Sequence, residues 1–322
     1  MTPPCTISRR SLLVATLAVP LCGGRAGGAQ QRRRIGWLVF GGPALGPVDR
    51  MLLDELVPIR ETNDIDYRHA DSAQQLAPLA AELAATRPDL LIGIGGDVVA
   101  ALRSASGTIP IVGAVSDDPV RAGHAVSFAR PGKNFTGITF ITDEMAGKRL
   151  EVLREAAPGI HHVGVLWNPQ HLDDEMTHVR QSAPQMGLAI TSHELHEPQG
   201  LDGALAEAVS AGADALFVIP SRLTGTLRGR IATFAREKKW PTVAAWREFT
   251  QSGCLISYGP NRLQQGKQLA SYVQRVLAGA RPADLPIERP ATFELVVNQQ
   301  TAAAIGLEIP PALLDRADAV IE

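Results

Sequence analysis

Short aliphatic runs alternate with longer amphipathic or alanine-rich stretches along the chain after residue 34. The short runs predict buried parallel strands, because a strand covered on both faces is apolar throughout. They lie at 35–40, 90–94, 109–115, 163–167, 189–193, 215–219 and 242–244. The longer stretches predict helices at 46–63, 76–86, 98–106, 143–157, 172–186, 201–211 and 228–239. Strands alternating with helices favour an α/β fold built from doubly wound parallel sheets.

Two segments of the chain repeat one order of features. Residues 83–114 give a helix, a strand that begins after Asp89, a turn, a second helix and a proline before the next strand. Residues 206–245 give the same order, with Asp214 before the strand. The repetition predicts two α/β domains of one design, and the mature length also favours two domains.

The C-terminal part departs from this alternation. It predicts strands at 255–258 and 293–298, helices at 262–278 and 299–305, and a proline-punctuated stretch at 281–290. Such a tail after two domains indicates that the chain crosses the interface repeatedly and forms a hinge. We expect one lobe from 33–135 plus 258–285 and the other from 136–257 plus 286–322. Two lobes joined by a multi-crossover hinge are typical of a ligand clamp.

The first 29 residues have the pattern of an export signal. Arg9 and Arg10 precede Ser-Leu-Leu, an apolar run spans 12–21, and small residues end at Ala29. This order predicts a twin-arginine signal peptide cleaved after Ala29, and hence a periplasmic protein. The apolar run is shorter than the roughly 20 residues of a membrane span. A lipoprotein anchored through Cys22 is a weaker interpretation, because Leu21 stands where a small residue is expected.

Charge and cysteine content narrow the class of protein. Three of the 31 basic residues and none of the 33 acidic ones fall in the predicted leader, so the mature chain carries about five net negative charges. We therefore expect no binding to nucleic acid. Cleavage leaves Cys254 as the single cysteine, which excludes an internal disulfide and makes the apolar core the source of stability.

Motifs across the mature chain resemble the ABC transporter substrate-binding proteins related to tryptophan and other aromatic amino-acid binders. They include Thr108-Ile-Pro-Ile-Val112, Ala129-Arg-Pro-Gly-Lys-Asn-Phe-Thr-Gly137, Val165-Leu-Trp-Asn-Pro169, Trp246-Arg-Glu-Phe249 and Ser257-Tyr-Gly-Pro-Asn261. The resemblance implies the type I periplasmic-binding fold, with a small-molecule solute held between two lobes. It also implies transient docking on an inner-membrane ABC permease, and we expect a monomer. The turns at 41–43 and 94–97 depart from the family pattern, so aromatic specificity is not carried over.

Topology predicts where the solute binds. In open α/β sheets, ligands lie beyond the carboxyl ends of the strands, where glycines let backbone N–H groups approach and helix N-termini favour a carboxylate. The carboxylates of Asp97 and Asp117 can hold an ammonium group, and Trp246 and Tyr258 can offer an aromatic face. We expect ligand contacts from Gly41, Gly42, Gly95, Gly96, Asp97, Ser116, Asp117, Asn168, Ser221, Trp246 and Tyr258.

Several of these residues, and Asp118 beside them, have a structural alternative. Asp97 and Ser221 can each cap the helix that follows, and Asp118 before Pro119 is typical of a turn. Trp246 can pack in a core, and Tyr258 can brace the hinge.

No sequence motif indicates catalysis. The chain lacks a Gly-x-Ser-x-Gly elbow, a phosphate-loop lysine motif and a Gly-x-Gly-x-x-Gly fingerprint. No histidine spacing favours a metal site, and Cys254 is expected to be a small buried hydrophobe. We expect no catalytic residue, no metal and no cofactor. Three functions stay open: a solute-binding protein of an ABC transporter, an exported sensor subunit of the same fold, and, least favoured, an exported α/β enzyme.

Overall fold

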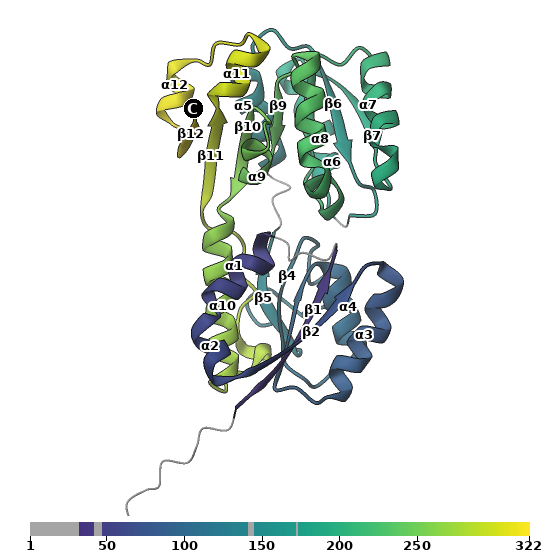
Figure 1. The fold of residues 1–322 in the computed structure, drawn as a ribbon, viewed down its shortest axis with the longest axis vertical. Helices are drawn as coiled ribbons and strands as arrows, with labels where there is room; N and C mark the ends of the chain where they lie inside the picture. Colours follow the sequence, from purple (N-terminus) through teal and green to yellow (C-terminus); the bar gives the residue numbers. More distant parts are fainter. Residues whose placement is uncertain (1–31, 42–46, 141–144, 172) are drawn as a thin grey trace, which may run out of the picture. The chain divides into compact units, whose positions relative to one another are not determined.

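The first sheet has five parallel strands in the order β2-β1-β3-β4-β5 (Figure 1). The computed structural model describes residues 32–41, 47–140, 145–171 and 173–322. The strands are β1 (Arg34–Phe40), β2 (Asp64–Ala70), β3 (Leu90–Ile94), β4 (Ile111–Val115) and β5 (Phe135–Thr139). We call this sheet and its covering helices lobe 1.

Helices cover both faces of the first sheet. They are α1 (Pro47–Glu55), α2 (Val57–Thr62), α3 (Ala73–Ala85), α4 (Gly96–Ala105) and α10 (Arg262–Leu277), followed by the 3₁₀ turn η3 (Pro282–Asp284). Ile35 and Trp37 pack under α1 and α10, whereas Leu38 packs under α3 and α4. Successive strand residues point to opposite faces, which explains why these strands are apolar at every position.

The second sheet has seven strands in the order β12-β11-β10-β9-β8-β6-β7. Its strands are β6 (His162–Trp167), β7 (Ala189–Glu194), β8 (Ala215–Val218), β9 (Thr242–Ala244), β10 (Ile256–Pro260), β11 (Phe293–Asn298) and β12 (Ala319–Ile321). The β10–β11 pair is antiparallel and the other neighbours are parallel. We call this sheet and its helices lobe 2.

The helices of lobe 2 also lie on both faces of their sheet. They are α5 (Met145–Ala156), α6 (Glu175–Ser182), α7 (Leu201–Ser210), α8 (Arg222–Lys238), α9 (Arg247–Gln251), α11 (Gln299–Ile305) and α12 (Pro311–Asp315), with 3₁₀ turns η1 (Ala183–Met186) and η2 (Pro198–Gly200). Phe217 packs with the residues of α5 and α6, whereas Leu216 and Val218 pack with those of α7 and α8. No described helix has the length and apolarity needed to cross a bilayer.

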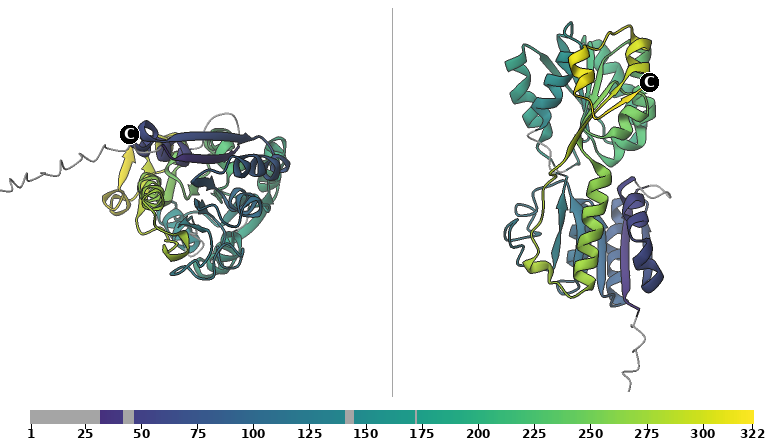
Figure 2. Two further views of the ribbon diagram at one scale, coloured as in Figure 1. Left: turned by 90° about the horizontal axis from the view of Figure 1, so that it is seen from below. Right: turned by 90° about the vertical axis from the view of Figure 1, so that its left-hand side faces the viewer.

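Elements that are distant in the sequence join the lobes. By the elements that the structure describes, the chain passes from β5 to lobe 2, returns from β10 to α10 in lobe 1, and goes back to β11. On the last return, Thr139 N–H donates to the Glu288 carbonyl at 2.8 Å, which holds this segment along β5. Figure 2 shows α10 alongside the strands of the first sheet. The predicted fold class, two doubly wound lobes joined by several crossovers, is confirmed.

Some element boundaries differ from the sequence predictions. The single helix expected at 46–63 is two helices that meet at Leu56. The edge strand β2 was not among the expected strands, because its half-exposed, polar residues lack an apolar run. The helix expected to begin at residue 228 begins at Arg222, and the helix expected at 172–186 ends as a 3₁₀ turn that contains Pro184.

Candidate functional site

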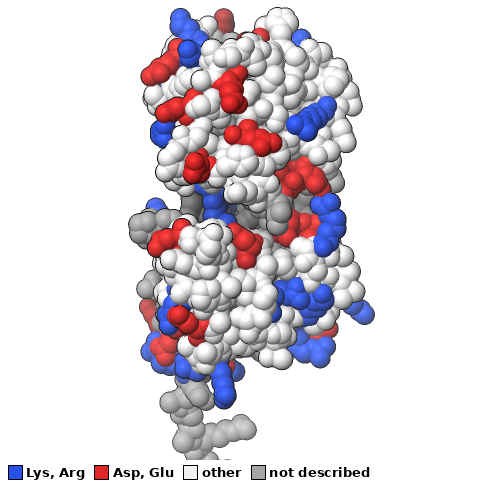
Figure 3. Space-filling view, turned by 90° about the vertical axis from the view of Figure 1, so that its right-hand side faces the viewer, with Lys and Arg blue, Asp and Glu red and all other residues white. Residues whose placement is uncertain are grey.

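The two sheets have the same strand order around their switch points. In lobe 1 the order reverses between β1 and β3, and in lobe 2 it reverses between β6 and β8. Ligands of open α/β sheets bind outside the carboxyl ends of the strands at such a point, because the loops there leave in opposite directions. Arg222 follows β8 and reaches Asp97, which follows β3, so the two switch points face each other. Figure 3 shows the surface hollowed at this level, with charged side chains at the rim.

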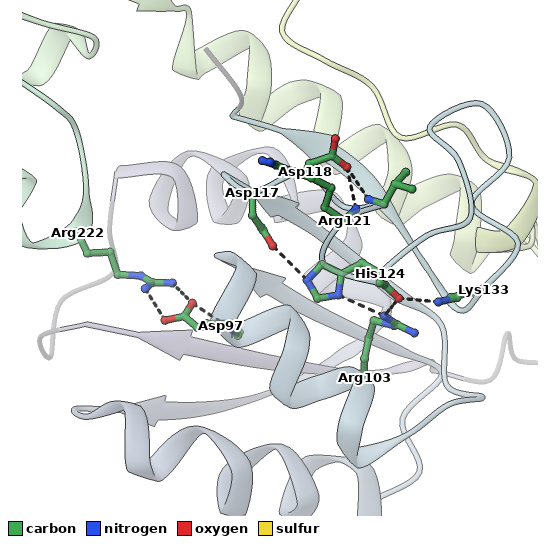
Figure 4. A network of polar contacts seen from close by, with 11 residues as sticks. Asp97, Arg103, Asp117, Asp118, Arg121, His124, Lys133 and Arg222 are labelled. Carbon is green, nitrogen blue, oxygen red and sulfur yellow. Dashed lines mark hydrogen bonds and ion pairs between the residues drawn. The ribbon is translucent and has the colours of Figure 1, made fainter. Parts of the chain in front are cut away.

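Arg222 carries its guanidinium from lobe 2 onto lobe 1 (Figure 4). Its Nη1 donates to Oδ2 of Asp97 at 2.8 Å, and its Nη2 donates to Oδ1 at 2.7 Å. Nη2 also donates to the carbonyl oxygen of Ile94 at 3.0 Å. The guanidinium carbon lies 4.6 Å from the ring centre of Phe40. The bidentate ion pair and the contact with the Phe40 ring therefore join lobe 2 to lobe 1 across the cleft.

Gly95 and Gly96 leave room for charged side chains. Gly95 has a φ of +113°, and a Cβ built there would lie 1.8 Å from Nη2 of Arg222. A Cβ at Gly96 would lie 2.4 Å from Oδ1 of Asp117. The pair of glycines therefore lets Arg222 and Asp117 approach the start of α4. Gly95 supplies the N-cap position of that helix, so the alternative of Asp97 as the cap is wrong.

Asp117 is buried at the end of β4 and is backed by a polar network (Figure 4). Its Oδ2 lies 3.7 Å from Nε2 of His124. Nδ1 of His124 lies 3.3 Å from Nη1 of Arg103, and the Arg103 guanidinium and the Lys133 ammonium both donate to the Gly123 carbonyl, at 2.5 and 2.6 Å. Oδ1 of Asp117 has no hydrogen-bond partner in the part of the chain that the structure describes.

Burial is the largest cause of the pKa shifts of His124 and Asp117 in this network. It lowers the pKa of His124 to about 4, and the charges of Arg103 and Lys133 act in the same direction. Burial also raises the pKa of Asp117, with a further increase from the nearby carboxylates Asp97 and Asp118. His124 is therefore neutral at pH 7, and a nearby cation would stabilise the ionised form of Asp117 that burial disfavours.

A second contact between the lobes lies at the cleft rim. Oδ1 of Asp118 accepts from the N–H groups of Val120 at 2.7 Å and Arg121 at 3.1 Å, which confirms its role as a turn former. The turn presents Arg121, whose Nη2 lies 2.6 Å from Oδ2 of Asp174 in lobe 2. Both side chains of this ion pair are exposed.

The loop after β6 brings further polar groups to lobe 2. Oδ1 of Asn168 accepts from the N–H of Gln170 at 2.9 Å, so its amide shapes the turn. His171 follows, and its Nε2 lies 3.4 Å from Oδ2 of Asp173. Burial lowers the pKa of His171 to about 4, assisted by the charge of Arg222. His171 was not among the residues predicted to contact the solute.

A buried ion pair lies behind this loop. Nη2 of Arg149 is 2.7 Å from Oε1 of Glu175, and both side chains are almost completely buried. Asp173 accepts from the N–H of Glu175 at 3.1 Å. Burial raises the pKa of Asp173 to about 6, against the lowering effects of that hydrogen bond and of Arg149. The cluster fixes the entry into α6.

Ser221 serves as a helix cap. Its Oγ accepts from the N–H of Thr224 at 3.1 Å, and the Thr224 hydroxyl accepts from the N–H of Ser221 at 2.8 Å. This reciprocal capping box begins α8 six residues earlier than expected and places Arg222 at the first helical position. Ser221 is 1% exposed, so it acts on the cleft through the residue that follows it.

The predicted aromatic residues lie near the hinge. Trp246 receives the guanidinium of Arg262 at 4.1 Å from its ring centre, and the same guanidinium lies 5.8 Å from the ring of Phe140. Tyr258 lies 6.4 Å from Phe293 in the neighbouring strand. A Cβ on Gly225 would be 3.6 Å from Trp246, so this ring also lies beside the first turn of α8.

The remaining predicted residues lie at strand ends. Gly41 follows β1 with a φ of +126°, and its N–H donates to the carbonyl oxygen of Ala70 at 3.1 Å. Ser116 is half-buried between β4 and Asp117, and Gly42 lies outside the described residues. The structure thus brings Gly95, Gly96, Asp97 and Asp117 together with Arg222, while their contact with a solute stays a prediction.

The described residues contain no group of three or more His, Cys, Asp and Glu side chains that could hold a metal ion. Burial raises the pKa of the Cys254 thiol to about 12, which confirms that this cysteine is a buried small hydrophobe.

Comparison with known proteins agrees with the fold. The chain is 23% identical to the tyrosine-binding protein of Clostridioides difficile (strain R20291) over 248 residues, which cover 76% of this chain and 71% of that protein. It matches the crystal structure of a conserved domain protein from Vibrio cholerae with a TM-score of 0.81 and 26% identity, over 90% of this chain and 100% of the other. It matches the structure of an ABC domain in complex with L-Trp from Streptococcus pneumonia with a TM-score of 0.81 and 22% identity, over the same shares.

Residues 49–321 match the family of ABC transporter substrate binding proteins. The match covers most of the chain and includes both lobes and the segments that join them. The members of this family bind substrates and are not enzymes as a class. The chain belongs to the ABC transporter substrate-binding protein family.

Proposed function

We propose that this protein binds a small α-amino acid between its lobes and delivers it to an ABC permease. The observation that carries the proposal is the contact of Arg222 with Asp97, Ile94 and Phe40, since both lobes contribute charged or aromatic groups to one place. The relatives named for tyrosine binding and for a complex with L-Trp support an amino acid as the solute class.

Closure around the solute is the proposed mechanism. A solute shifts the balance between open and closed lobes only through its higher affinity for the closed form, so it must contact both lobes. From lobe 1 we propose contacts by Gly41, Gly42, Gly95, Gly96, Asp97, Ser116 and Asp117. From lobe 2 and the hinge we propose contacts by Asn168, Trp246 and Tyr258, with Ser221 acting through the start of α8.

A binding screen tests this function. The purified protein is mixed with each of the twenty standard L-amino acids, and the melting temperature and the heat of binding are measured. We expect saturable one-to-one binding of at least one amino acid, with a rise in melting temperature because the ligand binds the folded state. Mass spectrometry of the mixture should show the amino acid unchanged. Absence of binding by every amino acid would refute the proposal, and chemical conversion of the solute would favour an enzyme.

Export through the twin-arginine signal is the second part of the proposal. Replacing Arg9 and Arg10 by lysine should retain the protein in the cytoplasm, and N-terminal sequencing of the exported wild type should begin at Gln30. Unchanged export of the lysine variant would refute the twin-arginine route.

A further inference from the structure

The groups around the Arg222 guanidinium on lobe 1 all favour a cation. They are the carboxylate of Asp97, the carbonyl oxygen of Ile94 and the ring face of Phe40. Gly95 lies among them, and any side chain there would overlap the guanidinium. We call these four residues the cation receptor. It sits at the β1/β3 switch point, where open α/β sheets bind their ligands.

Asp117 adds to the negative potential beside the cation receptor. Its carboxylate lies against Gly96, and burial together with the charge of Asp97 raises its pKa. The nearest ring, His124, is neutral at pH 7 because burial lowers its pKa to about 4. Asp97 pairs with Arg222, and the carboxyl group of Asp117 lies beside Gly96 at the start of the same helix, where a cationic group stabilises its ionised form.

The contact between Arg222 and the cation receptor is suited to exchange. The side chains of Arg222 and Asp97 are 39% and 37% exposed, so water screens their attraction. Ion pairs this exposed contribute little to stability, and breaking them costs correspondingly little. The geometry is nevertheless specific, since a bidentate pair, a third hydrogen bond and a ring face fix the guanidinium in one place.

We propose that Arg222 occupies the cation receptor in the ligand-free protein and that the ammonium group of the bound amino acid replaces it. The released guanidinium then pairs with the carboxylate of the same amino acid. Each charge that loses a partner gains another, and the amino acid carries one charge of each sign, so the exchange leaves the net charge of the cleft unchanged. The inference rests on the proposed function and names the group through which lobe 1 holds the solute.

Chemical rescue tests the cation receptor without knowledge of the natural solute. In Arg222→Ala the receptor is empty, and methylguanidinium should bind there, as detected by saturation-transfer NMR. Binding should be at least tenfold weaker in wild type, where Arg222 competes, and in Arg222→Ala/Asp97→Asn, where the carboxylate is absent.

Arg121→Ala is the matched control for the rescue. Arg121 also pairs across the lobes, with Asp174 at 2.6 Å, but on an exposed rim. Methylguanidinium should bind to this variant as weakly as to wild type, because Arg222 still occupies the receptor. The four proteins compared are wild type, Arg222→Ala, Arg222→Ala/Asp97→Asn and Arg121→Ala. If methylguanidinium binds equally to all four, or to none of them, the proposed cation receptor is refuted, even if an amino acid binds to the wild type.

Analogues of the amino acid test the exchange of partners. For each amino acid that binds wild type, the N-acetyl form lacks the cation and the carboxamide form lacks the anion. We expect each to bind at least tenfold more weakly, with the carboxamide penalty smaller in Arg222→Ala than in wild type. Equal affinity of the N-acetyl form would overturn the replacement of Arg222 by an ammonium group. If no amino acid binds, the proposed function and the exchange fail together, whereas the rescue experiment still decides the receptor by itself.

Discussion

The two lobes share a strand order but present opposite chemistry to the cleft. The switch point of lobe 1 offers the carboxylates of Asp97 and Asp117 and the carbonyl of Ile94. The switch point of lobe 2 offers the guanidinium of Arg222 and the neutral ring of His171. The fold therefore sets where the loops meet, while a few side chains at the strand ends set what they attract. Opposite charges on facing lobes suit a ligand that carries both.

Each lobe supports its cleft loop by a buried polar cluster of a different kind. In lobe 1, Asp117 lies 3.7 Å from the neutral ring of His124. In lobe 2, Arg149 and Glu175 form a buried ion pair at 2.7 Å. The first cluster depends on a protonation state, and the second depends on two charges compensating each other. The variants below separate these two dependences, beginning with the largest effect.

Removal of one charge from the ion pair of lobe 2 should have the largest effect. Glu175→Ala leaves the guanidinium of Arg149 buried without that carboxylate, and we expect a loss of about 3 kcal/mol in the free energy of unfolding. Urea denaturation measures this loss. Glu155→Ala on α5, the helix that carries Arg149, removes an exposed pair with Arg316 and should cost less than about 0.5 kcal/mol. Equal losses in the two variants would contradict the importance of the buried pair.

The cluster of lobe 1 should respond to acid. Burial lowers the pKa of His124 from 6.5 to about 4, so the folded state resists its protonation. Below pH 6.5 the unfolded chain protonates this ring, whereas the folded protein does so only near pH 4. The free energy of unfolding therefore decreases by up to about 3 kcal/mol as the pH falls from 6.5 to 4. The free energy of unfolding, measured from pH 7 to pH 4, should therefore fall less in His124→Gln than in wild type. Identical pH profiles would show that His124 does not titrate in this way.

The hinge contact should have an intermediate effect. Arg262 places its guanidinium 4.1 Å from the ring centre of Trp246, and its Nε lies 3.5 Å from Glu248. Arg262→Met keeps the length of the side chain but loses the charge, and we expect a cost of about 1–2 kcal/mol and a changed tryptophan emission. Arg275→Met, on an exposed position of the same helix beside Tyr272, is the control and should leave both quantities nearly unchanged.

The two contacts across the cleft should have the smallest effects on stability. Arg222→Gln and Arg121→Gln each remove an exposed ion pair, so each should lower the free energy of unfolding by less than about 1 kcal/mol. They should differ in binding, because Arg222 lies at the switch points and Arg121 lies on the rim. Calorimetric titration with the bound amino acid should show weaker affinity for Arg222→Gln alone. Equal weakening in both would mean that lobe contact, and not the local chemistry, sets the affinity.

The sequence allowed prediction of the fold because the central strands are continuous apolar runs. The edge strands β2 and β12 were not predicted, because β2 has exposed and polar positions and β12 has only three residues. The loops that meet in the cleft were also predictable, since strand ends in parallel sheets share one edge. The contacts that each side chain makes across the cleft were not predictable. The pairing of Asp97 with Arg222 joins residues 125 positions apart, and no local pattern encodes that distance. His124 was missed because its role depends on tertiary burial.

A crystal structure of the protein with the amino acid that binds it would test the account most directly. We expect density for the amino acid between the β1/β3 and β6/β8 switch points. Its ammonium group should lie against Asp97 and the Ile94 carbonyl, and Arg222 should have moved from Asp97 to the ligand carboxylate. An amino acid bound elsewhere on the molecule, with the Arg222–Asp97 pair intact, would contradict the account.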